Sequence, residues 1–215
     1  MKIFILSFVV ASFPTLAFSQ NLIVIRHGEA EHNVKGIFSS KIQNAYKYPL
    51  TSKGKEQLSA AAVELRNKYG YNDQTISAVY YSPFLRTKES AEVLVEKVGI
   101  SKSKLIEDVL LVDLDMGFWE EGVEADFFRS YSKGRRVGEI CSALYKGESR
   151  EDLEKRIRIF LERVKKTSSA TTGDILVVTH GSPAVVFNSL MSRDHSTLQD
   201  PKNAEIKVLD LSLLH

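Results

Sequence analysis

Residues 22–29 read Leu22-Ile23-Val24-Ile25-Arg26-His27-Gly28-Glu29. The first four side chains of this stretch are apolar and mostly β-branched, a pattern that is typical of a strand buried on both faces. The apolar run then stops at an arginine, a histidine and a glycine. We therefore predict a central strand over 22–25, with polar chemistry at its carboxyl end.

Further apolar runs predict three more strands, over 78–81, 105–112 and 175–178. Helical spacing of apolar residues predicts helices over 51–70, 82–99, 149–164 and 183–191. Three of these helices start with an N-cap signal, namely Thr51, Ser82 followed by Pro83, and Ser149. The segment 123–145 is irregular and is expected to be helical in part. Alternating strands and helices indicate an α/β fold with a mainly parallel sheet that is covered on both faces.

The composition is that of an ordinary globular protein. The chain has 215 residues, is 43% hydrophobic and carries a formal net charge of +2. Because the basic residues are scattered, a strongly cationic nucleic-acid binder is excluded as the default interpretation. The single cysteine, Cys141, excludes a disulfide scaffold.

The first nineteen residues differ from the rest of the chain. Lys2 precedes an apolar run, which is followed by Pro14 and by the small residues Ala17 and Ser19. This layout predicts a signal peptide over 1–19, cleaved before Gln20, and one domain over 20–215. A membrane anchor is the alternative, but the run of roughly 16 residues is shorter than the ~20 needed to span a bilayer. We expect a periplasmic or secreted protein without stable membrane insertion after cleavage.

The strand ends are the expected site, because ligands of such sheets bind beyond the carboxyl ends of the strands. Arg26 and His27 follow the first strand, Arg86 follows the second, and His180 follows the strand over 175–178. Two guanidinium groups beside two imidazoles suit a tetrahedral dianion such as phosphate. A metal site on His27, His32 and His180 is the other interpretation. Its spacing fits neither a helical ligand pair nor a short zinc motif, so no metal and no other cofactor is expected.

Three segments carry a family resemblance: Arg26-His27-Gly28-Glu29, Ser82-Pro83-Phe84-Leu85-Arg86-Thr87 and Thr179-His180-Gly181. They resemble the signatures of the histidine phosphatase superfamily, the phosphoglycerate mutase-like proteins. Supporting segments follow in the expected order at Asn33, 49–54, 147–149 and 203–206. The resemblance spans about residues 22–210 and implies a three-layer α/β/α sandwich with a mostly parallel central sheet.

The resemblance also implies roles for individual residues. His27 is the expected nucleophile, which forms a phosphohistidine that water then hydrolyses. Arg26, Arg86 and His180 are expected to hold the non-bridging phosphate oxygens. Asn33 is expected to bind substrate as a further donor, and Gly28 and Gly181 to let the backbone approach it.

The proton donor departs from the family pattern. Where the family has a glutamate four residues before the glycine, this chain has Asp113 before Gly117. Asp113 is the expected general acid, provided that its surroundings raise its pKa. One extra residue between Trp119 and Gly122 leaves Glu120 and Glu121 as alternatives.

The expected activity is that of an exported phosphomonoesterase acting on a small phosphorylated substrate. A mutase-like phosphotransferase and a catalytically weak phospho-ligand-binding protein are the alternatives within the fold. A haloacid dehalogenase-type site at Asp113-Leu114-Asp115 is disfavoured by Gly117, and a cysteine phosphatase by Gly147, six residues after Cys141.

Substrate selectivity is expected to come from the segments 34–48 and 118–146. The second segment offers aromatic and basic side chains that could contact a substrate or simply pack, namely Trp119, Phe127, Phe128, Arg129, Arg135 and Arg136.

Overall fold

A five-stranded sheet forms the centre of the computed structural model, which describes residues 20–130, 146–168, 173–191 and 200–214. The strands are β1 (Asn21–Arg26), β2 (Ile76–Tyr81), β3 (Leu105–Glu107), β4 (Asp174–Thr179) and β5 (Ile206–Asp210). Their order in the sheet is β3-β2-β4-β1-β5. The pairs β1–β4, β2–β4 and β2–β3 are parallel, and β5 runs antiparallel to β1. The predicted mostly parallel sheet is confirmed.

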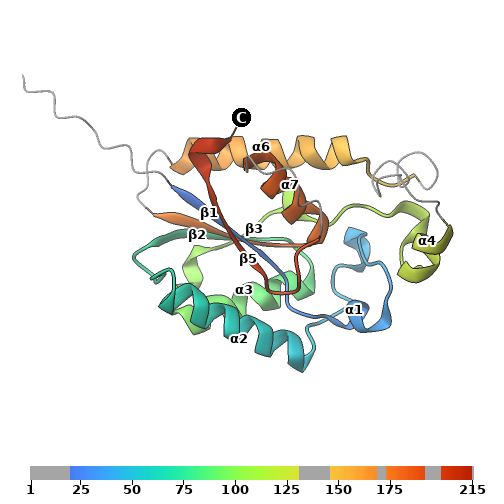
Figure 1. Ribbon diagram of the computed structural model, residues 1–215, viewed down its shortest axis with the longest axis horizontal. Helices are drawn as coiled ribbons and strands as arrows, with labels where there is room; N and C mark the ends of the chain where they lie inside the picture. The colour runs from blue at the N-terminus through green and yellow to red at the C-terminus, as the bar shows by residue number, and fades with distance from the viewer. Residues whose placement is uncertain (1–19, 131–145, 169–172, 192–199, 215) are drawn as a thin grey trace, which may run out of the picture.

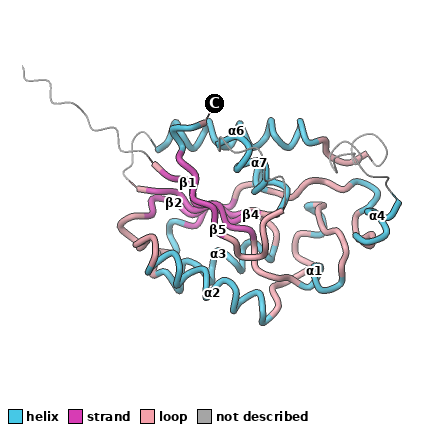
Figure 2. The backbone as a smooth tube through the Cα atoms, in the orientation of Figure 1, coloured by secondary structure: helices cyan, strands magenta, loops and turns pink. Residues whose placement is uncertain are grey.

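Helices cover both faces of this sheet, so the three-layer α/β/α architecture is also confirmed (Figure 1). One face carries α2 (Ser52–Asn67) and α3 (Leu85–Val98), and the other carries α6 (Arg150–Ser168) and α7 (Gly181–Met191). The two short helices α1 (Glu31–Lys35) and α4 (Glu124–Ser130) lie beyond one end of the strands (Figure 2). Short 3₁₀ turns occupy Ile42–Asn44, Lys102–Lys104, Val109–Leu111, Gly117–Trp119 and Leu211–Leu213.

The burial of both faces of β1 explains why its sequence is continuously apolar. Leu22 and Val24 belong to the core under α6 and α7. Ile23 and Ile25 belong to the core over α2 and α3. Successive side chains of a strand point to opposite faces, so a strand with helices on both sides needs an apolar residue at every position. The same alternation holds in β4, where Ile175 and Leu176 enter opposite cores.

Two of the predicted helix starts are confirmed by their capping bonds. The Thr51 hydroxyl oxygen accepts a hydrogen bond from the Gly54 backbone N–H at 3.0 Å at the start of α2. The Ser149 hydroxyl oxygen accepts one from the Asp152 N–H at 3.0 Å, and α6 begins at Arg150. Each side chain satisfies a backbone donor that has no partner within its helix.

The predicted helix start at Ser82 is wrong. Helix α3 begins at Leu85, and its N-cap residue Phe84 makes no side-chain capping bond. Ser82 is fully buried, and its backbone N–H continues the pairing toward β4 by donating to the Val178 carbonyl at 3.2 Å. The chain therefore stays extended through the serine and turns only afterwards.

The predicted strand over 105–112 is too long, and the helix predicted from 183 begins earlier. Strand β3 ends at Glu107, because the Asp108 side chain accepts the Leu110 N–H at 3.0 Å and starts a 3₁₀ turn. Helix α7 begins at Gly181, directly after β4. The expected helix within 123–145 is present as α4, and residues 131–145 lie outside the described residues.

The predicted signal peptide over 1–19 and Cys141 also lie outside the described residues. Among the helices that the structure describes, none is both long enough and apolar enough to cross a membrane.

Candidate active site

The carboxyl ends of β1, β2 and β4 meet at one edge of the sheet. Arg26 pairs with Thr179 in the register of β1 and β4, and the His27 N–H donates to the Thr179 carbonyl at 2.9 Å. His180 follows Thr179 directly, and Ser82 follows β2. The sequence prediction that these strand ends converge is therefore confirmed.

Arg86 lies at the centre of this cluster, in the first turn of α3, with its side chain 1% exposed. Its Nε donates to His27 Nε2 at 3.2 Å, and its Nη2 lies 3.0 Å from His180 Nδ1. Nη2 also donates to the Ser39 carbonyl at 2.8 Å. Burial lowers the pKa of Arg86 to about 10, which leaves it protonated near neutral pH. The two histidines are therefore joined through one buried cation.

His27 is held as a neutral imidazole with a defined tautomer. Its Nδ1 lies 2.8 Å from the Gly28 carbonyl, which only accepts hydrogen bonds, so Nδ1 carries the proton. Nε2 then has a free electron pair, directed at Arg86. Burial lowers the pKa of His27 well below its usual value, and the charge of Arg86 lowers it further. A neutral Nε2 in an anion-binding setting is what a nucleophile toward phosphorus requires.

His180 has the opposite tautomer. Because an arginine can only donate, Nδ1 accepts the bond from Arg86 and Nε2 carries the proton. Nε2–H donates to the Ser82 hydroxyl oxygen at 2.8 Å. The rings of His180 and His27 lie 5.3 Å apart between centroids. Ser82 is thus a site residue that the sequence analysis interpreted as a helix cap, although its position directly after β2 is the same signal that identified both histidines.

Asp113 lies near Arg86 and His180, beyond hydrogen-bond distance of either side chain. Its Oδ2 lies 3.7 Å from Arg86 Nη2 and 3.8 Å from His180 Nδ1, and its side chain is 25% exposed. Burial raises the pKa of Asp113 to about 6, while the charge of Arg86 opposes the rise. A carboxyl group with such a pKa is protonated in mildly acidic solution and can donate that proton.

The two alternative donors are engaged elsewhere. Glu120 accepts from the Ser40 N–H at 2.8 Å and from Asn44 Nδ2 at 2.9 Å. Glu121 accepts from Lys47 Nζ at 2.9 Å and from the Tyr48 hydroxyl at 2.8 Å. Since both carboxylates hold loop segments by several bonds, the geometry favours Asp113 among the three.

Arg26 and Asn33 have backbone anchors beside the site. Arg26 Nη1 donates to the Pro201 carbonyl at 2.7 Å. Asn33 Oδ1 accepts the Ala30 N–H at 3.0 Å, and its Nδ2 donates to His32 Nε2 at 3.0 Å. The asparagine thus shapes the turn that leads into α1.

Close packing leaves little room for a side chain at Gly28 and Gly181, the two glycines predicted to bind substrate. A Cβ on Gly28 would lie 2.5 Å from the Gly54 carbonyl oxygen, and one on Gly181 would lie 2.7 Å from Asp200 Oδ2. The Gly54 carbonyl is backbone and excludes a side chain at Gly28, whereas a side chain at Gly181 would require the Asp200 carboxylate to move. Their contact with a substrate stays a prediction.

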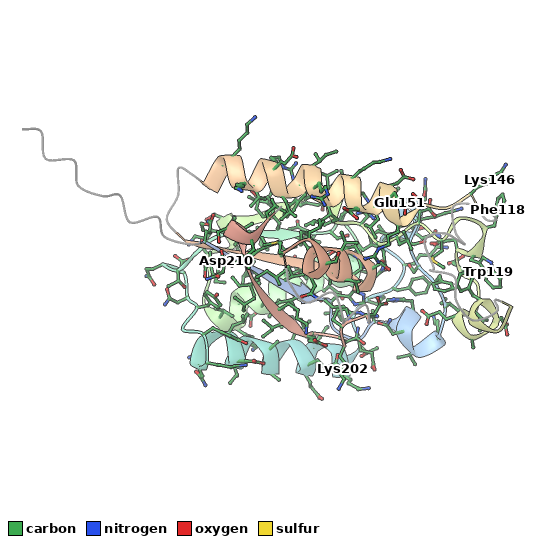
Figure 3. The ribbon with its side chains drawn as sticks, turned by 45° about the horizontal axis from the view of Figure 1, so that its top comes forward. Phe118, Trp119, Lys146, Glu151, Lys202 and Asp210 are labelled. Carbon is green, nitrogen blue, oxygen red and sulfur yellow. The ribbon has the colours of Figure 1, made fainter. Side chains whose placement is uncertain are left out.

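The segment 118–146, one of the two expected to select the substrate, contains both buried and exposed side chains. Phe127 is fully buried, and its ring lies 5.3 Å from that of Trp119 between centroids. Phe118 is mostly exposed, and Figure 3 shows it with Trp119 and Lys146 at one end of the molecule. Phe127 is therefore a core residue. The side chains of Phe128 and Arg129, and all of Arg135 and Arg136, lie outside the described residues.

Within the described residues, no group of three or more His, Cys, Asp and Glu side chains is arranged to hold a metal ion.

Comparison with known proteins gives one family. The model of the histidine phosphatase superfamily (branch 1) matches residues 22–212. The chain is 29% identical over 199 residues to the 2,3-bisphosphoglycerate-dependent phosphoglycerate mutase of Thermoplasma acidophilum, a match that covers 89% of this chain and 87% of the relative. It is 22% identical over 204 residues to sedoheptulose 1,7-bisphosphatase of Saccharomyces cerevisiae, covering 85% and 73% of the two chains.

Among solved structures, the phosphoglycerate mutase from Bacillus anthracis superimposes with a TM-score of 0.72 at 19% identity. The match covers 91% of this chain and 96% of the mutase chain, so the two proteins share the same fold.

Ser82→Ala is expected to lower the free energy of unfolding by about 1–3 kcal/mol, because the buried His180 Nε2–H would lose its acceptor. Ser77→Ala is the matched control at the other end of β2. Its half-buried hydroxyl donates to the carbonyls of Gly173 and Asp174, and its loss should cost less than about 1 kcal/mol. Urea unfolding measures both. A loss in Ser82→Ala no larger than in Ser77→Ala would contradict the role given to Ser82.

Proposed function

The chain belongs to the histidine phosphatase superfamily (branch 1), and from that premise we propose that it is a phosphomonoesterase acting through a phosphohistidine on His27. The observation that carries the proposal is the neutral His27 Nε2, which lies 3.2 Å from Nε of a buried arginine that also binds His180. A nucleophile beside a permanently charged donor suits attack on a phosphate ester.

The chemistry is two displacements at phosphorus. His27 Nε2 attacks the phosphorus atom, the bond to the ester oxygen breaks, and Asp113 gives its proton to the leaving alkoxide. A water molecule then attacks the phosphorus atom of the phosphohistidine, the bond between phosphorus and His27 Nε2 breaks, and the Asp113 carboxylate takes one proton from the attacking water. Inorganic phosphate leaves, and both side chains return to their starting protonation states.

Charge stabilisation is assigned to Arg26, Arg86 and His180. Arg86 exchanges its bonds to the imidazoles for bonds to phosphate oxygens, which are stronger because both partners are charged. A dianion beside His180 also raises the pKa of the ring, so that Nδ1 can take up a proton from solvent and donate a hydrogen bond to the third oxygen.

A mutase is the second candidate, favoured by the match to the Thermoplasma mutase. A mutase passes the phosphoryl group from the histidine to a second phosphorylated molecule instead of to water. Hydrolysis is the better proposal for an exported chain, which meets few metabolic bisphosphates. Assays with and without a bisphosphorylated primer separate the two, since only a mutase needs the primer.

His27→Ala is expected to abolish hydrolysis of an aryl phosphate, with a loss of kcat of at least about a thousandfold. In the unchanged protein, alkaline quenching during turnover should trap one phosphoryl group on His27, detected by mass spectrometry. Full activity of His27→Ala would remove the covalent mechanism. Stoichiometric binding of the aryl phosphate without turnover would instead identify a ligand-binding protein.

Asp113→Asn is expected to remove the pH dependence attributed to the acid. With the pKa of Asp113 raised to about 6 in the ligand-free protein, kcat/KM should fall as the pH rises above that value, because the carboxyl group then loses the proton it must donate. In Asp113→Asn this fall should disappear, and esters with poor leaving groups should suffer most. Asp115→Asn is the matched control, since its side-chain oxygen can still accept the Gly117 N–H. A rate optimum above pH 8 in the unchanged protein would exclude the acid role.

Export is the remaining part of the proposal and is supported by the apolar pattern of residues 1–19. Expression of the full chain in a secretion-competent bacterial host should place the protein outside the cytoplasm. Its N-terminal sequence should then start at Gln20. A product that keeps Met1 and remains in the membrane fraction would identify the segment as an anchor instead.

A further inference from the structure

A third imidazole, that of His32, lies beside the two histidines of the proposed mechanism. Its side chain comes from α1, is 5% exposed, and has its ring centroid 5.5 Å from that of His27. The proposed reaction gives it no part. The sequence offers His32 only as a metal ligand, in the alternative interpretation of the site.

The protonation of the His32 ring follows from its neighbour. Asn33 Oδ1 accepts the Ala30 backbone N–H at 3.0 Å, which fixes the orientation of the amide. Asn33 Nδ2 therefore donates to His32 Nε2, also at 3.0 Å. Because Nε2 accepts a hydrogen bond, the proton of the neutral ring is on Nδ1.

This Nδ1–H group is a buried donor without an acceptor among the described residues. Leaving a buried N–H unpaired is costly, and such groups are rare in native structures. The Nε of Arg26 is a second buried donor without an acceptor in the described part of the chain. Two unpaired donors around one nucleophile indicate that the missing acceptors belong to an oxygen-rich ligand.

The electrostatics of the pocket excludes two other roles for His32. Burial lowers the pKa of His32 to about 2, with Arg86 and Arg26 adding to the effect, so the ring neither gains nor releases a proton at ordinary pH. It therefore cannot act as a general acid. The same two arginines repel a cation, and a proton occupies Nδ1, so a metal ligand is not expected either.

We propose that His32 is a further substrate-binding residue, whose Nδ1–H donates a hydrogen bond to an oxygen of the phosphorylated substrate in the His27 pocket. Asn33 is its positioning residue, because the bond from Asn33 Nδ2 keeps the proton on Nδ1. The proposal rests on the proposed phosphatase function and adds a neutral donor to the charged groups already assigned there.

Two variants distinguish a substrate-binding role of His32 from a purely structural one. His32→Phe keeps a ring of similar shape without the donor, whereas His32→Asn places an amide N–H close to the position of Nδ1–H. Inorganic phosphate is the probe, measured as an inhibitor of aryl phosphate hydrolysis and by calorimetry. We expect His32→Phe to weaken phosphate binding and to lower kcat/KM, each by about tenfold, and His32→Asn to restore both to within about threefold.

Stability and pH provide readouts that a purely structural role would not match. His32→Phe deletes an unpaired donor but also removes the acceptor of the part-buried Asn33 amide, so the two effects oppose each other and its free energy of unfolding should change little. The tenfold effect should also be constant between pH 5 and 8, because the ring stays neutral there. In ¹⁵N-histidine-labelled unchanged protein, the His32 Nδ1 proton should move downfield when inorganic phosphate is added, a test that needs no variant.

The outcomes distinguish this inference from the function on which it rests. If the unchanged protein neither binds phosphate nor hydrolyses the ester, the proposed function fails. If it does both, and His32→Phe binds phosphate equally well, the assignment of His32 is wrong. A His32→Phe variant that loses stability and binding together, with no shift of the Nδ1 proton in the unchanged protein, overturns the assignment as well.

Discussion

The burial of the Arg86 guanidinium is the constraint on which the site depends. A buried charge is costly unless hydrogen bonds and opposite charge compensate it. Arg86 meets this requirement with the Ser39 carbonyl, the two imidazoles and the Asp113 carboxylate at 3.7 Å. An arginine only donates, so both imidazole nitrogens that face it must be unprotonated. One buried cation thereby sets the tautomers of both histidines.

The segment that accepts the Arg86 bonds needs its own support, and Glu120 provides it. The Ser39 carbonyl belongs to a loop whose next residues, Ser40 and Lys41, donate backbone N–H groups to Glu120 at 2.8 and 3.1 Å. The Ser40 hydroxyl donates to the same oxygen at 2.8 Å and in turn accepts the Met116 N–H. A carboxylate that the sequence offered as a proton donor thus anchors the loop against which Arg86 rests.

The sequence predicted those parts of the fold that one local pattern determines. Strands β1 and β4 are buried on both faces, so each is a continuous apolar run, and the residues after each run identified His27 and His180. The Ser82-Pro83 pair misled the prediction because it is a strong local cap signal. Sheet pairing to Val178 and the bond from His180 hold Ser82 instead. The state of His32 had no sequence signal, since it depends on the orientation of Asn33 and on burial by distant segments.

The same physical effect prepares the proposed nucleophile and the proposed acid. Burial disfavours the charged form of any group, so it lowers the pKa of His27 and raises that of Asp113. Arg86 strengthens the first shift and weakens the second. A carboxylate in direct hydrogen-bond contact with Arg86 would have a lower pKa, because the guanidinium stabilises its charged form. The short aspartate side chain stops at 3.7 Å from the guanidinium, which leaves burial as the larger effect. Aspartate in place of the glutamate of the family pattern is thus compatible with acid catalysis, because burial raises its pKa to about 6 despite the nearby Arg86.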